Sequence, residues 1–148
     1  MFQAKPIIDL AIVIPTLNEE HYIGKLLDSI ANQTVLPKEI VVVDAYSKDK
    51  TIARIRKRQK VLPQLKMFQI ARLTISRQRN LGVKKTNSEH ILFLDADMEL
   101  KDRDTLKKYM GEVLEKKPDL AAAKNLPNSK YWKDLIFFWL EDSVFKFC

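Results

Sequence analysis

The chain has 148 residues, and its 26 lysines and arginines against 19 aspartates and glutamates give a formal net charge of +7. Hydrophobic residues at 46% and charged residues at 30% are typical of a folded globular protein and exclude a disordered or fibrous one. Three glycines and one cysteine exclude glycine-rich dinucleotide and Walker phosphate loops, an intramolecular disulfide and a cysteine-based zinc cluster.

The length predicts a single domain over residues 1–148. The N-terminal segment carries Asp9 and has no small-residue cleavage site after its apolar run, so no signal peptide is expected. No run of about 18 apolar residues occurs, so no transmembrane helix is expected either. We therefore expect a cytoplasmic protein.

Short apolar runs alternate with amphipathic stretches, which predicts βαβ units over a mainly parallel sheet. The predicted strands cover residues 10–14, 40–43, 65–70, 91–94 and 120–123. The predicted helices begin at Asn18 as N-cap, at Ser47 or Asp49 as N-cap, at Ile75 and at about Asp102, and a last one covers 131–148.

Polar clusters follow three of these strands, at residues 16–19, 44–47 and 95–97. Each cluster alone is explained equally well by a helix cap or a solvated turn. In open parallel sheets, however, ligands bind outside the carboxyl ends of the strands. Three clusters in this order therefore favour a ligand site at one sheet edge.

Asp95 and Asp97 follow the apolar run ILFL and are the sharpest feature of the sequence. Two carboxylates at this spacing can face one metal ion, or one can bind the metal and the other a ribose hydroxyl. Mg²⁺ and Mn²⁺ prefer oxygen ligands, and Mg²⁺ is usually held by one or two carboxylates together with substrate phosphates. The pair therefore indicates a divalent-cation site.

Three segments carry a resemblance to a known family: AIVIPTLNEEHYIGKLLDSIANQT (11–34), EIVVVDAYSKDKT (39–51) and SRQRNLGVKKTNSEHILFLDADMEL (76–100). With this spacing the chain resembles the N-terminal, nucleotide-binding part of a family 2 glycosyltransferase over about residues 9 to 125. The resemblance implies a three-layer α/β/α sandwich of the GT-A type with a mainly parallel sheet, here truncated. It also implies metal-assisted, inverting transfer of a sugar from a nucleotide-diphospho-sugar.

The resemblance assigns roles to individual positions. Mn²⁺ or Mg²⁺ would neutralise the diphosphate leaving group. Base and ribose would lie against Pro15, Thr16, Asn18 and Glu19, and the base would donate a hydrogen bond to Asp44. Arg79 would lie near the phosphates. Asp97 would be the direct metal ligand and catalytic residue, Asp95 would bind the metal nearer the ribose, and Ala96 lies between these two aspartates.

The sequence departs from the family pattern in two places. Ala45 and Tyr46 replace the second acid and the glycine of V-D-D-G-S, which leaves the identity of the nucleotide open. The chain also stops where relatives continue into an acceptor-binding half. Glu141 and Asp142 resemble the family's acid pair and are candidates for the general base, or else they are solvated helix acids.

Two other functions remain as alternatives. A non-catalytic or partner-dependent module would bind a nucleotide-sugar without the acceptor half. A haloacid-dehalogenase-type phosphotransferase also places two aspartates after a strand, but Met98 and Glu99 do not fit its D-x-[TV] continuation. The acceptor is unidentified, and a lipid-linked acceptor fits the positive charge.

Two segments have a structural and a functional interpretation. Residues 54–60 carry five basic side chains, which favours a solvated helix face with Ile52 and Ile55 turned inward over nucleic-acid or membrane binding. Residues 131–148 hold both tryptophans in an amphipathic pattern. This pattern fits core packing, a homo-oligomer interface or a membrane surface, the last making the protein peripheral to the membrane.

Overall fold

The computed structural model describes residues 5–71 and 74–118. The chain divides into two compact units, Met1–Met110 and Gly111–Cys148, and all the strands below belong to the first. The predicted strand at 120–123 and helix at 131–148 lie outside the described residues. A single domain over residues 1–148 therefore stays a prediction.

The strands form one parallel sheet in the order β3-β2-β1-β4, with β1 at Ile7–Thr16, β2 at Leu36–Asp44, β3 at Leu65–Gln69 and β4 at His90–Phe93. Thr16 pairs with Asp44, and Asp44 pairs with Gln69, so three strands end in line at the same edge. The predicted parallel sheet is confirmed. Its carboxyl edge carries the first two polar clusters that the sequence singled out.

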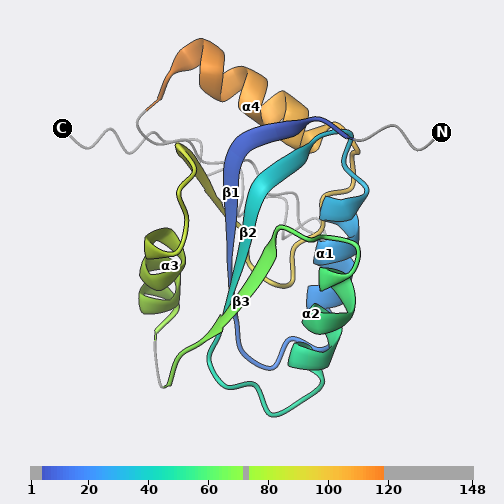
Figure 1. The fold of residues 1–148 in the computed structure, drawn as a ribbon, viewed down its shortest axis with the longest axis vertical. Coiled ribbons are helices and arrows are strands. Elements are labelled where there is room, and N and C mark those ends of the chain that lie inside the picture. Colours follow the sequence, from blue (N-terminus) through green and yellow to red (C-terminus); the bar gives the residue numbers. More distant parts are fainter. Residues whose placement is uncertain (1–4, 72–73, 119–148) are drawn as a thin grey trace, which may run out of the picture. The chain divides into compact units, whose positions relative to one another are not determined.

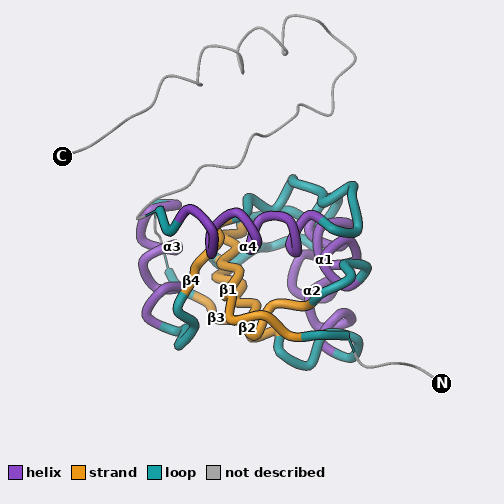
Figure 2. Tube along the Cα trace, turned by 90° about the horizontal axis from the view of Figure 1, so that it is seen from above, coloured by secondary structure: helices purple, strands orange, loops and turns teal. Residues whose placement is uncertain are grey.

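The helices are α1 at Ile23–Ala31, α2 at Thr51–Gln59, α3 at Ile75–Lys84 and α4 at Thr105–Lys116. Figure 1 shows α3 on one side of the sheet and α1 with α2 on the other, and the view from above in Figure 2 agrees. The predicted three-layer α/β/α arrangement is confirmed. No helix among the described residues is long and apolar enough to cross a bilayer.

The central strands and α1 build the main core. Leu10, Ile12 and Ile14 of β1 are fully buried on the side of the sheet that packs against α1. The face that α1 contributes is Ile23, Leu26, Leu27 and Ile30, as the 3.6-residue spacing predicts. On the opposite face α3 approaches closely at Gly82, where an added Cβ would lie 2.2 Å from Val13 Cγ1.

The prediction that Asn18 caps the first helix is wrong. The helix begins five residues later at Ile23, and Asn18 has a positive φ of 56°. Its side-chain oxygen instead accepts a hydrogen bond of 2.9 Å from the backbone N–H of Lys48 in the next loop. The chain turns between residues 18 and 22 before the helix starts, and the Asn18 side chain connects this loop to the loop after β2.

The second helix begins at Thr51, close to the predicted start. Lys50 occupies the N-cap position, and Asp49 before it accepts a hydrogen bond of 2.9 Å from Thr51 N–H. Ile55 is buried, and the basic side chains of Arg54, Arg56, Lys57 and Lys60 are exposed. This arrangement agrees with the solvated-face interpretation of the basic segment.

The last described strand differs from its prediction. The continuous apolar run ILFL predicts a buried strand, but β4 lies at the edge of the described sheet and most of it is half-buried. Phe93 is 41% exposed, and the guanidinium carbon of Arg79 lies 5.6 Å from the centre of its ring. The strand therefore delivers Asp95 to a solvent-accessible edge.

Candidate functional site

The loops after β1 and β2 meet at the carboxyl edge of the sheet and are joined along their length. Asn18 N–H donates to Ser47 Oγ at 2.8 Å, and Glu19 N–H donates to Thr51 Oγ1 at 2.7 Å. Glu20 N–H then donates to Asp49 Oδ2 at 3.1 Å. Successive backbone donors of one loop thus end on side-chain oxygens of the other. This pattern holds the two loops as one rigid surface.

Asp44 is the centre of this surface. It is fully buried, and its two carboxylate oxygens accept four hydrogen bonds. The donors are Thr16 Oγ1 at 3.3 Å, Ser47 N–H at 3.0 Å, Ser47 Oγ, and Gln69 Nε2 at 3.2 Å. An ionised carboxylate offers about four acceptor sites. Asp44 is therefore saturated by the protein itself in this structure.

Two residues of these loops adopt the left-handed backbone region that normally favours glycine. Asn18 and Tyr46 both have a φ of 56°. Asparagine tolerates this region, whereas a bulky residue adopts it only when its surroundings enforce it. The enforcing bonds at Tyr46 lie on both sides, from Ala45 N–H to Thr16 O at 2.9 Å and from Ser47 N–H to Asp44.

The segment after β4 carries the two aspartates and is bound more loosely. Ala96 is buried, Asp95 is half-exposed and Asp97 is exposed. Arg79 of α3 donates from its terminal nitrogen to Asp95 Oδ1 at 2.8 Å. Arg79 Nε is buried without a hydrogen-bond partner in the described structure. Arg79 therefore joins the β4 end of the edge to the helix beside it.

The carboxylates of the two regions are near enough to affect one another. Burial raises the pKa of Glu19, and the negative charges of Asp97, Asp49 and Asp95 raise it further. Glu19 and these three aspartates lie on three segments, after β1, β2 and β4, so the fold brings acids from three strand ends near one another. A divalent cation would relieve their mutual repulsion.

The donor chemistry fits a hard cation that also takes ligands from a substrate. Within 5–71 and 74–118, no group of three or more histidine, cysteine or acidic side chains is arranged to hold a metal ion. The segment after β4 supplies two carboxylates, Asp95 and Asp97, and magnesium sites with one or two carboxylates are completed by substrate phosphates. The residues present therefore fit a metal that binds with a diphosphate.

The sequence interpretation missed Gln78, next to the predicted Arg79. Gln78 is 3% exposed, and its amide donates to Thr16 O at 2.9 Å and Val43 O at 2.8 Å. It thereby ties the ends of β1 and β2 to α3. In the sequence, Gln78 is an uncharged residue between two arginines in SRQRN, and nothing in this pattern distinguishes it from a surface residue.

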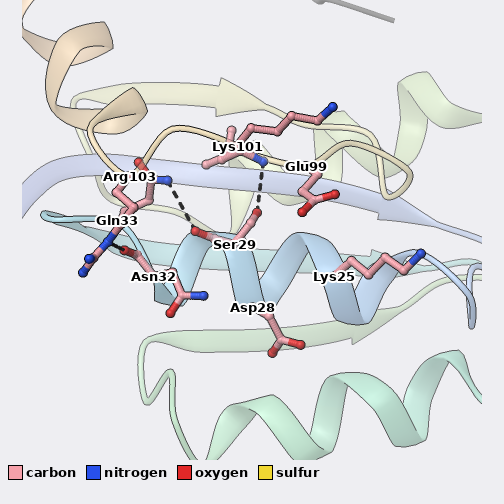
Figure 3. A pocket seen from close by; sticks show the side chains of 9 residues that line it. Lys25, Asp28, Ser29, Asn32, Gln33, Glu99, Lys101 and Arg103 are labelled. Atoms are coloured by element: carbon pink, nitrogen blue, oxygen red, sulfur yellow. Dashed lines mark hydrogen bonds between the residues drawn. The ribbon is translucent and has the colours of Figure 1, made fainter. Parts of the chain in front are cut away.

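A hollow of about 620 Å³ lies along α1, away from the predicted residues (Figure 3). Its floor is bonded internally: Leu100 N–H donates to Ser29 Oγ at 3.1 Å, and Gln33 Nε2 donates to Asp102 O at 2.8 Å. Charged side chains such as Lys25 and Glu99 line its rim. These hydrogen bonds connect α1 and Gln33 to residues 99–103, so we interpret the polar groups of the hollow as structural.

The predicted site residues fall into three groups. Asn18, Glu19, Asp95 and Asp97 lie at the carboxyl edge with accessible side chains, and Arg79 reaches the same place. Pro15, Thr16, Asp44 and Ala96 are buried beneath it and shape it. Glu141 and Asp142 lie outside the described residues. Their role as general base stays a prediction.

Comparison with known proteins gives a consistent family. The family model described as "Glycosyl transferase family 2" matches residues 11–134. The poly(ribitol-phosphate) beta-N-acetylglucosaminyltransferase TarS of Staphylococcus aureus is 34% identical over 119 residues, which cover 77% of this chain and 20% of TarS. The O-antigen chain rhamnosyltransferase RfbN of Salmonella typhimurium is 33% identical over 101 residues, or 66% of this chain and 31% of RfbN.

Solved structures agree with this assignment. A crystal structure of S. aureus TarS 1-349 in complex with UDP-GlcNAc superposes with a TM-score of 0.69 at 30% identity, covering 82% of this chain and 38% of that one. The mannosyltransferase PcManGT from Pyrobaculum calidifontis, in complex with GDP-Man and Mn²⁺, gives 0.65 at 28% identity, covering 74% and 33%. The chain therefore spans from about a fifth to two fifths of the length of these relatives.

Proposed function

The chain belongs to glycosyl transferase family 2, and from this premise we propose that it binds a nucleotide-diphospho-sugar at the carboxyl edge of its sheet and transfers the sugar to an acceptor. The observation that carries the proposal is that Asp95 and Asp97 follow β4 at the same sheet edge as Glu19, near enough for their charges to raise its pKa, and that Asp95 bonds the guanidinium of Arg79. Acids that repel one another next to a cation suit a ligand made of a metal ion and phosphates.

The metal in this proposal is Mn²⁺ or Mg²⁺, held by Asp97 and Asp95. Bound there, the ion would neutralise the charge that develops on the departing diphosphate. Asp97 is exposed and free to contribute its carboxylate directly. Asp95 accepts a hydrogen bond from Arg79, and in this proposal Arg79 would contact the phosphates. The Mn²⁺ complex of PcManGT supports this choice of ion.

The joined loops after β1 and β2 form the nucleoside side of the proposed site. Asn18 and Glu19 present accessible polar side chains there. Asp44 acts beneath them by holding Ser47 and Thr16 in place. Asp44 can accept a hydrogen bond from the base only if one of its four present hydrogen bonds breaks. The bond from Gln69 is the candidate, because Gln69 is the most exposed of the donor residues.

Isothermal titration with UDP, GDP and dTDP, each with Mn²⁺ or with EDTA, tests the binding step. UDP is the first choice because TarS binds UDP-GlcNAc in its crystal structure. We expect metal-dependent binding that falls at least about tenfold in Asp97→Ala, since a lost metal ligand weakens the phosphate contact. Glu89→Ala, an exposed acid just before β4, is the matched control. Absence of binding at millimolar nucleotide with metal would refute the proposal.

Turnover separates a transferase from a module that binds without reaction. The wild-type chain should slowly hydrolyse its sugar nucleotide when no acceptor is present, and Asp97→Ala should not. The family resemblance leads us to propose inversion at the anomeric carbon, which NMR of the released sugar tests before it mutarotates. Binding without any hydrolysis favours the non-catalytic or partner-dependent alternative.

We further propose that residues 131–148 contact a membrane surface or a second copy of the chain. The support is their composition, with both tryptophans and several phenylalanines in 18 residues, together with the net charge of +7. Deletion of 131–148 should keep nucleotide binding and remove association with anionic liposomes or self-association. Unfolding of the shortened chain would show that the segment is core instead.

A further inference from the structure

We propose that the ring of Tyr46 is the stacking surface for the nucleobase, an inference that rests on the nucleotide binding proposed above. Tyr46 is 55% exposed on the loop directly after β2, one residue from Ser47 and two from Asp44. It is an exposed aromatic side chain at the sheet edge where the ligand is expected.

The backbone of Tyr46 shows that the fold keeps this residue against its local preference. Its φ of 56° lies in the region that disfavours a bulky L-residue. Strain of this kind persists where surrounding bonds enforce it and gathers at ligand sites. The backbone N–H groups on both sides of Tyr46 are bonded, that of Ala45 to Thr16 O and that of Ser47 to Asp44, and these bonds hold the backbone of Tyr46 in this conformation.

More than half of the Tyr46 side chain is exposed, and within the described ranges no cation–π contact involves its ring. Leu17, 52% exposed, lies on the opposite joined loop, next to Asn18, whose N–H bonds Ser47. The two joined loops thus each carry one exposed large apolar or aromatic side chain, Leu17 and Tyr46.

Saturation of Asp44 strengthens the assignment. With four protein donors on its carboxylate and no exposed surface, Asp44 is not available to a base without rearrangement. The accessible group next to it is Tyr46. Stacking on an aromatic ring accepts any base, so Tyr46 would supply affinity for the nucleoside, whereas the choice among bases would depend on neighbouring polar groups.

The test compares UDP with inorganic pyrophosphate, which lacks base and ribose, by titration in the presence of Mn²⁺. Tyr46→Ala should weaken UDP binding about tenfold, the usual size of a lost base–aromatic stack, and leave pyrophosphate binding unchanged. Tyr46→Phe should bind UDP as the wild type does. Tyr22→Ala removes a similarly exposed tyrosine, 49% exposed with an ordinary φ of −117°, and should change neither affinity.

Urea unfolding of Tyr46→Gly controls for the fold. Glycine accepts the left-handed backbone, so this variant should resist urea at least as well as the wild type while losing UDP affinity. Equal loss of UDP and pyrophosphate in Tyr46→Ala, unchanged UDP binding, or a loss in Tyr46→Phe as large as in alanine would each overturn the stacking role. A wild-type chain that binds no nucleotide refutes the proposed function itself.

Discussion

The loops after β1 and β2 and the segment after β4 meet at one edge of the sheet, yet they are built in opposite ways. In the first region Asp44 is fully buried and accepts four hydrogen bonds from the protein. In the second, Asp97 is exposed and Asp95 has one half-exposed arginine partner. Both regions contain carboxylates, but Asp44 is fully bonded within the protein, whereas Asp95 and Asp97 are accessible to the ligand that we propose.

This difference suggests a division of labour at the site. A rigid nucleoside surface needs no rearrangement on binding, which lowers the entropic cost of association. Loosely held carboxylates can reorient around a cation and its phosphates. The comparison therefore predicts that substitutions in the first region mainly lower stability, whereas substitutions in the second region mainly weaken binding.

The largest expected effect on stability is that of Asp44→Ala. It removes the acceptor of four hydrogen bonds and leaves the Thr16 and Ser47 donors unpaired, which should cost about 3 kcal/mol of unfolding free energy. Urea denaturation measures the loss. Asp97→Ala, the exposed acid of the other region, should change stability by less than about 0.5 kcal/mol. Equal losses in the two variants would contradict the division of labour.

Gly82→Ala should cost about 2 kcal/mol, because the new methyl group would meet Val13 Cγ1 at 2.2 Å and push α3 from the sheet. Since α3 carries Gln78 and Arg79, the same shift should loosen both regions of the site. Gly111→Ala is the matched control on α4, where an added Cβ meets nothing within 4 Å. That variant should gain a few tenths of a kcal/mol or more from helix propensity. Equal effects would show that the close contact relaxes freely.

These two predictions also show what the sequence was able to reveal. The strands, the parallel sheet and the layers were predicted from the apolar run 10–14, the β-branched run 40–43 and the spacing of Ile23, Leu26 and Ile30. Each of these patterns repeats with the period of its element and needs no knowledge of distant contacts. Positions of the acids at strand ends followed from the same reasoning.

Features that depend on contacts between loops were not predictable in this way. Asn18 was expected to cap a helix, but its acceptor oxygen meets Lys48, 30 residues away. Asp44 accepts four hydrogen bonds, and Gln78 donates two, to Thr16 O and Val43 O; together these bonds join the ends of β1, β2 and β3 to α3. The strained φ of Tyr46 follows from those bonds. A propensity describes a residue in its local sequence, whereas these roles arise from distant partners.

Glu39 offers a third kind of acid, buried near the start of β2 and far along the strand from Asp44. The N–H of Asn87 lowers its pKa below the ordinary 4.5, and Lys66 and Ser88 lower it further against the opposing effect of burial. A lowered folded-state pKa means that the ionised group stabilises the fold above about pH 4.5. That stability is lost as the pH falls through the folded-state pKa.

Glu39→Gln should therefore destabilise the protein by about 1 kcal/mol at pH 7, and the difference from wild type should shrink below about pH 4.5. Urea titrations across this pH range measure both effects. Glu112→Gln, which removes an exposed acid on α4, is the control and should change stability at pH 7 by less than about 0.5 kcal/mol. A difference that stays constant down to pH 3 would show that ionisation of Glu39 is not what stabilises the fold.

The smallest effect on stability is expected for Arg79→Gln, although this residue lies at the centre of the second region. Its side chain is 38% exposed and that of Asp95 is 44% exposed, so the ion pair contributes less than about 0.5 kcal/mol to folding. Binding should change more. Without the guanidinium, Asp95 loses its ion-pair partner and the positive charge beside the acids is gone, so Mn²⁺ alone should bind more tightly. UDP with Mn²⁺ should bind several-fold more weakly, because the proposed phosphate contact of Arg79 is lost. Arg58→Gln breaks a two-bond pair with Asp28, at 3.0 and 2.6 Å, outside the site and should leave both affinities unchanged. If Arg79→Gln unfolds as readily as Asp44→Ala, or weakens Mn²⁺ and UDP alike, the region after β4 is structural and the contrast between the two halves of the edge disappears.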